Sequence, residues 1–150
     1  MKTDFVTRME SPAPEDFARL RKAVGWKERS LAAIQAALPN SLCSVCVYRG
    51  DTLVGYGRLI GDGGLYCYIQ DMMVDPRYQH HGIGRIIMKE IMSYVKGLPH
   101  QDMFVGLMAA RGAESFYEKL GFASRPTDAP GMYWLGGDDL GCTGQAPASP

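Results

Sequence analysis

The sequence predicts an α/β fold in which one mixed sheet carries helices on both of its faces. Three observations support this prediction. Three segments with strand character follow one another between residues 42 and 74, and a strongly periodic helical segment comes after them. A Gln-x-x-Gly-x-Gly turn, from Gln79 to Gly84, joins the third strand to that helix. Strand and helix patterns then alternate toward the C-terminus.

One strand and two helices are predicted before the central strands. Residues 4–9 form the first strand, and Ser11-Pro12-Ala13-Pro14 introduces a helix that continues to about Val24. Proline is favoured in the first turn of a helix, where its missing N–H has no partner to lose. Ser30 can cap a second helix, which Pro39-Asn40 ends.

The central strands are separated by turn signals. Residues 42–48 and 52–60 are joined by Arg49-Gly50-Asp51, a short hairpin loop. Gly61-Asp62-Gly63-Gly64 then turns the chain into a third strand, residues 65–74.

The following helix has one apolar stripe. Ile83, Ile87, Ile91 and Val95 recur every four residues, as expected for a helix that lies on a sheet, and Gly97 ends it.

The C-terminal part predicts a strand at 103–108, a short helix at 112–120 and a last strand at 132–135. We expect a single domain over residues 1–138, followed by a disordered tail at 139–150 that is rich in Gly, Pro and small polar residues.

Composition excludes several classes of function. The chain has 150 residues, of which 46% are apolar, and 16 Lys and Arg residues balance 16 Asp and Glu residues. This balance favours neither nucleic acid nor a membrane surface, so a small molecule is the expected partner. No apolar stretch approaches the length of about 18 residues that a membrane span needs, and Met1-Lys2-Thr3-Asp4 does not resemble a signal peptide. We therefore expect a cytoplasmic protein.

Four cysteines raise the question of a metal or redox site. Cys43 and Cys46 lie three apart in a predicted strand, so their side chains point to opposite faces. Cys67 lies in another strand and Cys142 in the tail. We expect reduced thiols and no metal.

The Gly-x-Gly turn is a candidate phosphate site. Gly82 and Gly84 permit a tight turn and close backbone approach, and the first N–H groups of the helix point outward with the positive end of its dipole. A dinucleotide fingerprint would need a third glycine where Ile87 stands. A Walker loop would need Lys and Ser or Thr where Arg85 and Ile86 stand.

Two blocks carry a resemblance to a known family. Val74-Asp75-Pro76-Arg77-Tyr78-Gln79, with the glycines after it, resembles the Val-x-Pro-x-Tyr-Gln/Arg-x-x-Gly-x-Gly/Ala signature of the GCN5-related N-acetyltransferases (GNAT). Ser115-Phe116-Tyr117-Glu118-Lys119-Leu120-Gly121-Phe122 is similar to the later Phe-Tyr-x-x-x-Gly-Phe block of that family. The resemblance covers roughly residues 3 to 135.

The resemblance implies a mostly antiparallel sheet in which two parallel strands, 65–74 and 103–108, splay apart to admit acetyl-coenzyme A. It assigns pantetheine contacts to the backbone of three residues and pyrophosphate contacts to seven. These residues are Met72, Met73 and Val74 for the pantetheine arm, and Gln79, His80, His81, Gly82, Ile83, Gly84 and Arg85 for the pyrophosphate.

The histidine pair departs from the commoner residues of this loop. Two interpretations of His80 and His81 are open: loop residues that contribute only backbone N–H groups, or histidinium side chains that contact phosphate below about pH 6.5. Ala110 also departs from the family, which often has an asparagine there that contacts the cofactor arm.

Two residues are catalytic candidates. By resemblance, Tyr117 lies beside the cofactor sulfur and donates a hydrogen bond to the leaving thiolate. Asp71 matches the acidic residue that many members use to draw the amine proton through water, and a structural hydrogen-bonding role is the open alternative. Tyr66, Tyr68 and Gln70 should lie on the opposite face from Asp71 unless a bulge intervenes.

Aromatic residues suggest the acceptor. The candidates are Trp26, Tyr56, Tyr68, Tyr133 and Trp134, each with core packing as the alternative. The segment Pro130-Gly131-Met132-Tyr133-Trp134 resembles the end of the plant and cyanobacterial serotonin N-acetyltransferases. An aromatic or other small primary amine is the expected acceptor. Polyamines, aminoglycosides, amino sugars and protein N-termini stay open, as does a weakly active acyl-coenzyme A sensor. A homodimer is possible.

Overall fold

The computed structural model describes residues 4–136, which form two compact units divided between Met108 and Ala109. The first unit contains the sheet and three α-helices, and the second contains the short helix α4 (Glu114–Glu118). The single domain expected over 1–138 stays a prediction, and the expected tail at 139–150 lies outside the described residues.

The first unit is built around a five-stranded mixed sheet with the order β1-β2-β3-β4-β5. Neighbouring strands are antiparallel except β4 and β5, which are parallel. The strands are β1 (Phe5–Arg8), β2 (Cys43–Arg49), β3 (Thr52–Gly61), β4 (Tyr66–Val74) and β5 (Phe104–Leu107). The helical elements are α1 (Pro14–Ala23), α2 (Leu31–Ala37), the 3-10 turns η1 (Leu38–Asn40) and η2 (Pro76–Tyr78), and α3 (Ile83–Lys96). The predicted mixed sheet is confirmed.

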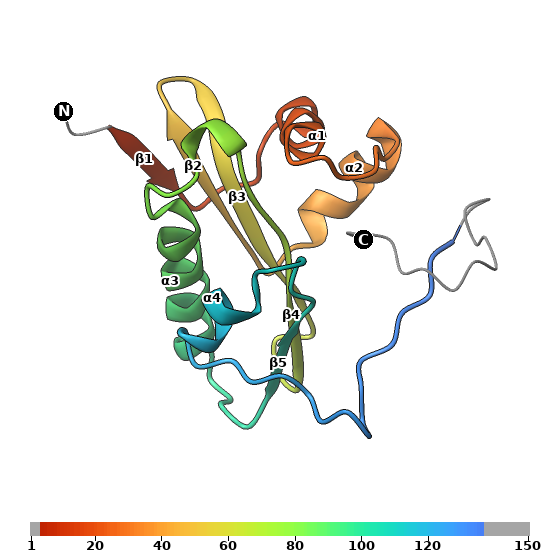
Figure 1. The fold of residues 1–150 in the computed structure, drawn as a ribbon. Helices are drawn as coiled ribbons and strands as arrows, with labels where there is room; N and C mark the ends of the chain where they lie inside the picture. Colours follow the sequence, from red (N-terminus) through yellow and green to blue (C-terminus); the bar gives the residue numbers. More distant parts are fainter. Residues whose placement is uncertain (1–3, 137–150) are drawn as a thin grey trace. The chain divides into compact units, whose positions relative to one another are not determined.

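Helices cover both faces of this sheet, as the sequence predicts. In Figure 1, α3 lies on one side of the strands, and α1 and α2 lie on the other. A Cβ atom added at Gly55 would lie 2.5 Å from Ile83, and one at Gly57 would lie 2.6 Å from Ile87. Glycine at these two positions therefore lets α3 approach the backbone of β3. On the opposite face, Phe17 of α1 contacts Tyr56 edge-on with 5.4 Å between ring centroids.

Each face has its own apolar core. On one face, the isoleucine stripe predicted for α3 is buried against the sheet: Ile83, Ile87 and Ile91 are at most 1% exposed. The core under α1 and α2 consists of Phe17, Leu20, Ile34, Leu38, Cys46, Leu53, Tyr56 and Met73. Because two cores hold the sheet between them, the conformation of β4 is constrained from both sides.

Local signals explain most element boundaries. The Ser30 hydroxyl accepts a hydrogen bond from the Ala33 N–H at 3.2 Å, as expected for the cap of α2. At the end of α3, the Gly97 N–H is within 3.2 Å of the Ser93 carbonyl oxygen and within 3.0 Å of that of Tyr94. The predicted helix at 112–120 shortens to Glu114–Glu118.

The last predicted strand, 132–135, is wrong, because these residues have no strand conformation. Met132 is 90% exposed and Trp134 is 78% exposed. Aromatic and apolar residues favour a strand only when a neighbouring strand supplies hydrogen bonds, and no strand in residues 4–136 pairs with this segment.

None of the helices within residues 4–136 is both long enough and apolar enough to span a lipid bilayer.

Candidate active site

Strand β4 offers an unpaired edge at its C-terminal end. Its pairing with β5 runs only from Tyr66 opposite Phe104 to Ile69 opposite Leu107, whereas β4 continues to Val74. Among the described strands, none pairs with residues 70–74 on that side. Backbone N–H and C=O groups there can bind an extended ligand as a further strand would. Met72, Met73 and Val74, predicted from the family resemblance to hold the pantetheine arm, all lie on this stretch.

The chain leaves β4 through a well-fixed turn. The Asp75 N–H donates to the Val54 carbonyl oxygen at 2.8 Å, which ties the turn to β3. The Asp75 side chain caps η2 by accepting from the Arg77 N–H at 3.0 Å, and it accepts from the Arg77 guanidinium at 2.8 Å. These bonds to Arg77 hold the pKa of the 1%-exposed Asp75 carboxyl below its ordinary value. The Gln79 amide nitrogen lies 3.4 Å from the Val74 carbonyl oxygen and closes the turn.

Two residues with positive φ shape the loop that follows. His80 has φ +64° and Gly82 has φ +79°, both in the left-handed region. Gly82 is the N-cap of α3, and the first hydrogen bond of the helix runs from the Ile86 N–H to the Gly82 carbonyl oxygen at 3.0 Å. The N–H groups of residues 83–85 precede the helical ladder and carry the positive end of the dipole. This arrangement suits a phosphate group.

His81 has a role within this loop. Its ring Nδ1 lies 2.8 Å from the Gln79 carbonyl oxygen and 3.1 Å from that of Tyr78. Because carbonyl oxygens only accept, Nδ1 carries the proton in these contacts. The ring also meets Phe5 of β1 edge-on, with 6.0 Å between centroids. These contacts help to keep the backbone of the loop in place.

A bulge interrupts β4 beside the unpaired edge. Tyr56 pairs with Met73, but Arg58 pairs with Gln70, so Gly57 alone faces both Asp71 and Met72. Asp71 occupies the bulge with φ +56°. An aspartate in this region costs on the order of 1–2 kcal/mol relative to ordinary backbone. Strict alternation along β4 would place Asp71 and Gln70 on opposite faces of the sheet, but the bulge places both on the same face.

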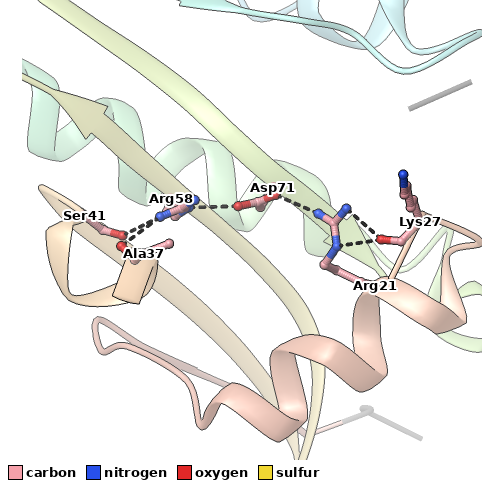
Figure 2. A network of polar contacts seen from close by, with 6 residues as sticks. All are labelled: Arg21, Lys27, Ala37, Ser41, Arg58 and Asp71. Carbon is pink, nitrogen blue, oxygen red and sulfur yellow. Dashed lines mark hydrogen bonds and ion pairs between the residues drawn. The ribbon is translucent and has the colours of Figure 1, made fainter. Parts of the chain in front are cut away.

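The Asp71 carboxylate lies between two arginines (Figure 2). Its Oδ1 accepts from Arg21 Nη1 of α1 at 3.2 Å, and its Oδ2 accepts from Arg58 Nε of β3 at 2.8 Å. The side chains of Arg21 and Asp71 are only 5% and 6% exposed. Burial lowers the pKa of the Arg21 guanidinium, and the charge of Asp71 partly offsets that effect. With both oxygens bonded, the contacts of Asp71 support the structural alternative.

The two arginines also hold the segments around them. Arg21 donates from Nε and Nη2 to the Lys27 carbonyl oxygen, at 3.3 and 3.1 Å, and its guanidinium lies 5.2 Å from the centroid of the Trp26 ring. Arg58 Nη1 lies 3.3 Å from the Ala37 carbonyl oxygen at the end of α2. The network thus joins β4 to the turn between α1 and α2.

An aromatic surface lies on this same face. Tyr66 and Phe104 are paired residues of β4 and β5, with ring centroids 6.4 Å apart, and they are 64% and 45% exposed. The half-buried Tyr68 is paired with Gly106. An added Cβ at Gly106 would lie 2.5 Å from the Phe104 ring and 2.9 Å from the Tyr68 ring. Glycine there leaves room for the rings of Tyr68 and Phe104.

The other predicted acceptor residues have different surroundings. Tyr56 is fully buried, its hydroxyl lies 2.9 Å from Ser44 Oγ, and burial raises its pKa to about 12. Trp26 is half-buried in the α1–α2 turn. Tyr133 is 49% exposed and, like Trp134, belongs to the second unit. Contact of any of these with an acceptor stays a prediction.

Tyr117 also belongs to the second unit. It lies in α4, is 8% exposed, and packs edge-on against Phe116 and Phe122 with centroids 5.0 and 6.2 Å apart. Burial raises the pKa of its phenol. Ala110, where the family often has asparagine, is exposed in the loop before α4. The role predicted for Tyr117 is not tested by these contacts.

The described cysteines are half-buried or buried. Burial raises the pKa of Cys43 to about 11 and that of Cys46 to about 12. The Cys46 thiol donates to the Glu10 carbonyl oxygen at 3.2 Å. Cys67 is 1% exposed, and Cys142 lies outside the described residues. Residues 4–136 contain no group of three or more Cys, His, Asp or Glu side chains arranged to hold a metal ion. Absence of a metal stays a prediction.

Arg21 and Arg58 were missed by the sequence analysis, although each left a signal. Arg21 follows Phe17 by four residues, on the apolar face of its helix. Arg58 stands within an otherwise apolar strand, two residues after Tyr56. A charged residue at a core position needs a buried partner, and Asp71 was available.

Comparisons with known proteins each match most of this chain. A model described as the acetyltransferase (GNAT) family matches residues 6–122. A ycf52-like uncharacterised N-acetyltransferase from Prochlorococcus marinus is 33% identical over 129 residues, covering 79% of this chain and 67% of the relative. GCN5-related N-acetyltransferase 2, chloroplastic, from Arabidopsis thaliana is 31% identical and covers 79% of this chain and 53% of the relative. A Staphylococcus aureus structure described as a probable acetyltransferase has a TM-score of 0.84 and 36% identity, covering 88% of this chain and 99% of that one.

Proposed function

Because the chain belongs to the GNAT family of acetyltransferases, we propose that it transfers the acetyl group of acetyl-coenzyme A directly to a primary amine of a small molecule. Family membership makes the chain an N-acetyltransferase and implies both an acetyl-coenzyme A donor and an amine acceptor. The proposal adds a small aromatic acceptor, a ternary complex without a covalent enzyme intermediate, and chemistry that needs no metal.

The unpaired edge of β4 is the observation that carries the donor proposal. The backbone of Met72, Met73 and Val74 binds the pantetheine arm, and N–H groups near Met73 and Val74 polarise the acetyl carbonyl. The loop from Gln79 to Arg85, with its left-handed Gly82 and uncommitted helical N–H groups, binds the pyrophosphate. When bound, acetyl-coenzyme A supplies the activated acetyl group for the transfer.

Tyr117 acts as a hydrogen-bond donor to the leaving thiolate. A thiol has a pKa of about 8.5, so complete proton transfer from a phenol whose pKa is raised above 10 is uphill. A hydrogen bond from a protonated phenol still stabilises negative charge as it develops on sulfur. Asp71, bonded to two guanidiniums, is assigned a structural role, and water carries the amine proton away.

The aromatic surface of Tyr66, Tyr68 and Phe104 supports a small aromatic acceptor. It shares a sheet face with Asp71 and flanks the unpaired edge of β4. A flat ring can stack on such side chains while its amine reaches the acetyl group. The likeness of Pro130–Trp134 to the serotonin N-acetyltransferases supports the same acceptor class.

Compartment and assembly stay predictions. The sequence favours a cytoplasmic protein, whereas the Arabidopsis relative is named chloroplastic, so a plastid is the competing compartment. A homodimer also stays a prediction.

Thiol release from acetyl-coenzyme A across a panel of amines tests this function. The panel pairs tryptamine and tyramine with spermidine, kanamycin and a short peptide that has a free N-terminus. We expect turnover of an aromatic amine, and a loss of kcat of about tenfold or more in Tyr117→Phe with unchanged donor affinity. Turnover of only the peptide or the polyamine would overturn the acceptor class. Donor binding by calorimetry without turnover of any amine would favour a sensor.

A further inference from the structure

One line of charge-assisted contacts connects the α1–α2 turn to the bulge of β4. It runs from the Lys27 carbonyl oxygen through Arg21 to Asp71, and from Asp71 through Arg58 to the end of α2, as Figure 2 shows. The Arg21 side chain is 5% exposed and that of Arg58 is 13% exposed. Bonds of this kind are stronger inside a protein than at its surface.

The central member of this line is adjacent in sequence to the proposed donor-binding backbone. Asp71 immediately precedes Met72, and its φ of +56° sets the direction in which the chain continues into residues 72–74. A residue in this backbone region persists only when its surroundings hold it there. The two guanidiniums bind separate oxygens of the carboxylate, so the Asp71 side chain cannot rotate without breaking a hydrogen bond.

We propose that Arg21 is a positioning residue for acetyl transfer. Through Asp71 it fixes the bulge that aims the backbone of residues 72–74 at the donor, and through Lys27 it holds the turn that carries Trp26. The inference rests on the proposed function, because it assumes that this backbone polarises the acetyl carbonyl. Arg21 does so without contact with the reacting atoms.

Arg58 also reaches the end of α2, but Arg21 is the member that joins Asp71 itself to an element outside the sheet. Arg58 and Asp71 come from paired strands, β3 and β4, which the sheet already holds together. Arg21 comes from α1 and reaches both β4 and the following turn. Its loss leaves the Asp71 carboxylate with the Arg58 contact alone, so the sheet stays intact while the bulge gains freedom.

The test measures the carbonyl of bound donor directly. Acetyl-coenzyme A labelled with 13C at the thioester carbonyl is bound to the wild type and to Arg21→Met, and the carbonyl band is recorded by isotope-edited infrared spectroscopy. Hydrogen bonds from the protein lower the carbonyl frequency. We expect a lowered, narrow band in the wild type, and in Arg21→Met a broader band shifted back toward its position in water.

Arg19→Met is the matched control. Arg19 lies on the same helix and donates to the Leu53 carbonyl oxygen at 2.8 Å, but it does not contact Asp71. We expect the wild-type band in this variant. Coenzyme A without the acetyl group should bind the wild type and Arg19→Met with affinities within about twofold of each other, because the contact of Arg19 with Leu53 leaves the bulge of β4 in place. A wild-type band in Arg21→Met would overturn the inference.

Two further outcomes separate the inference from the proposed function. An unshifted band in the wild type, despite donor binding, would refute polarisation by β4 and the inference with it. Arg21→Met should lower kcat about tenfold. Arg21→Lys keeps the charge but not the forked geometry, so it should recover part of the carbonyl shift and part of this loss in kcat. Equal loss in Arg21→Lys and Arg19→Met, with matching falls in Tm, would show that Arg21 only stabilises the fold and would overturn the inference.

Discussion

The two sides of the candidate site are built by different means. The loop at residues 79–85 is shaped by backbone conformation: His80 and Gly82 have positive φ, and helical N–H groups are presented to the ligand. The bulge of β4 is held by buried charges, with Asp71 between Arg21 and Arg58. The loop built from backbone tolerates changes of side chain but not of φ, whereas the charged network depends on which side chains stand at its positions.

Two glycines with the same φ test this contrast. Gly82 and Gly25 both have φ +79°, and an added Cβ would meet nothing within 4 Å at either position. Valine at either position therefore carries a similar backbone cost, on the order of 1–2 kcal/mol. We expect Gly82→Val to raise the Kd for coenzyme A by about tenfold to a hundredfold, because the loop can no longer present its N–H groups.

Gly25→Val serves as the control for backbone strain. Gly25 begins the turn that Arg21 holds, and its N–H donates to the Lys22 carbonyl oxygen at 3.0 Å. We expect calorimetry to give a nearly unchanged Kd for coenzyme A, while thiol-release kinetics show a higher KM for the amine. Equal changes in donor affinity for both variants would break the comparison, because general destabilisation would then explain both.

The same contrast explains which parts of the molecule the sequence predicts. Backbone demands are met by particular residues at fixed spacing, so Gly82, Gly84 and the isoleucine stripe of α3 are visible in one short stretch. The mixed sheet with helices on both faces follows from similar local patterns, and the structure confirms it.

Contacts between distant residues leave no such pattern. Arg21, Arg58 and Asp71 are separated by 37 and 13 positions, and only the fold brings them together. No glycine in the sequence indicates the positive φ of the bulge, because the two guanidiniums stabilise an aspartate at that position. The error at residues 132–135 has the related cause that strand propensity depends on a partner.

Asp75, at the other end of residues 72–74 from Asp71, is a second buried carboxylate whose contribution to stability should depend on pH. Arg77 holds the pKa of Asp75 below its ordinary value of 3.8, so the folded state binds this proton less readily than the unfolded state. The stabilisation is complete above pH of about 4 and is lost as the pH falls through the lower folded pKa. We expect Asp75→Asn to lower the free energy of unfolding by about 1–2 kcal/mol at pH 7.

Chemical denaturation between pH 7 and pH 2 measures this effect. The difference between the wild type and Asp75→Asn should shrink as the pH falls below about 4, because the wild type then loses the same charge. Asp51→Asn, in the exposed β2–β3 hairpin, should follow the wild type at every pH. A difference that is constant with pH would mean that the contacts with Arg77 do not depend on the charge of Asp75.

The smallest expected effect concerns His81, and it separates two ways in which the donor loop can use a histidine. Nδ1 bonds the carbonyl oxygens of Tyr78 and Gln79, so His81→Ala removes contacts that hold backbone. We expect the Kd for coenzyme A to rise about twofold to fivefold, the value of one ordinary hydrogen bond. The increase should be similar at pH 5.5 and pH 8, because backbone support does not need a charged ring.

Calorimetry with coenzyme A at both pH values decides between support and charge. An imidazolium in contact with phosphate would make the loss distinctly larger at pH 5.5, because a charge-assisted bond would disappear there and not at pH 8. His100→Ala, in the exposed segment after α3, controls for the general loss of a histidine. A strong pH dependence specific to His81→Ala would move part of the donor site from backbone to side chains, which would weaken the contrast between the two sides.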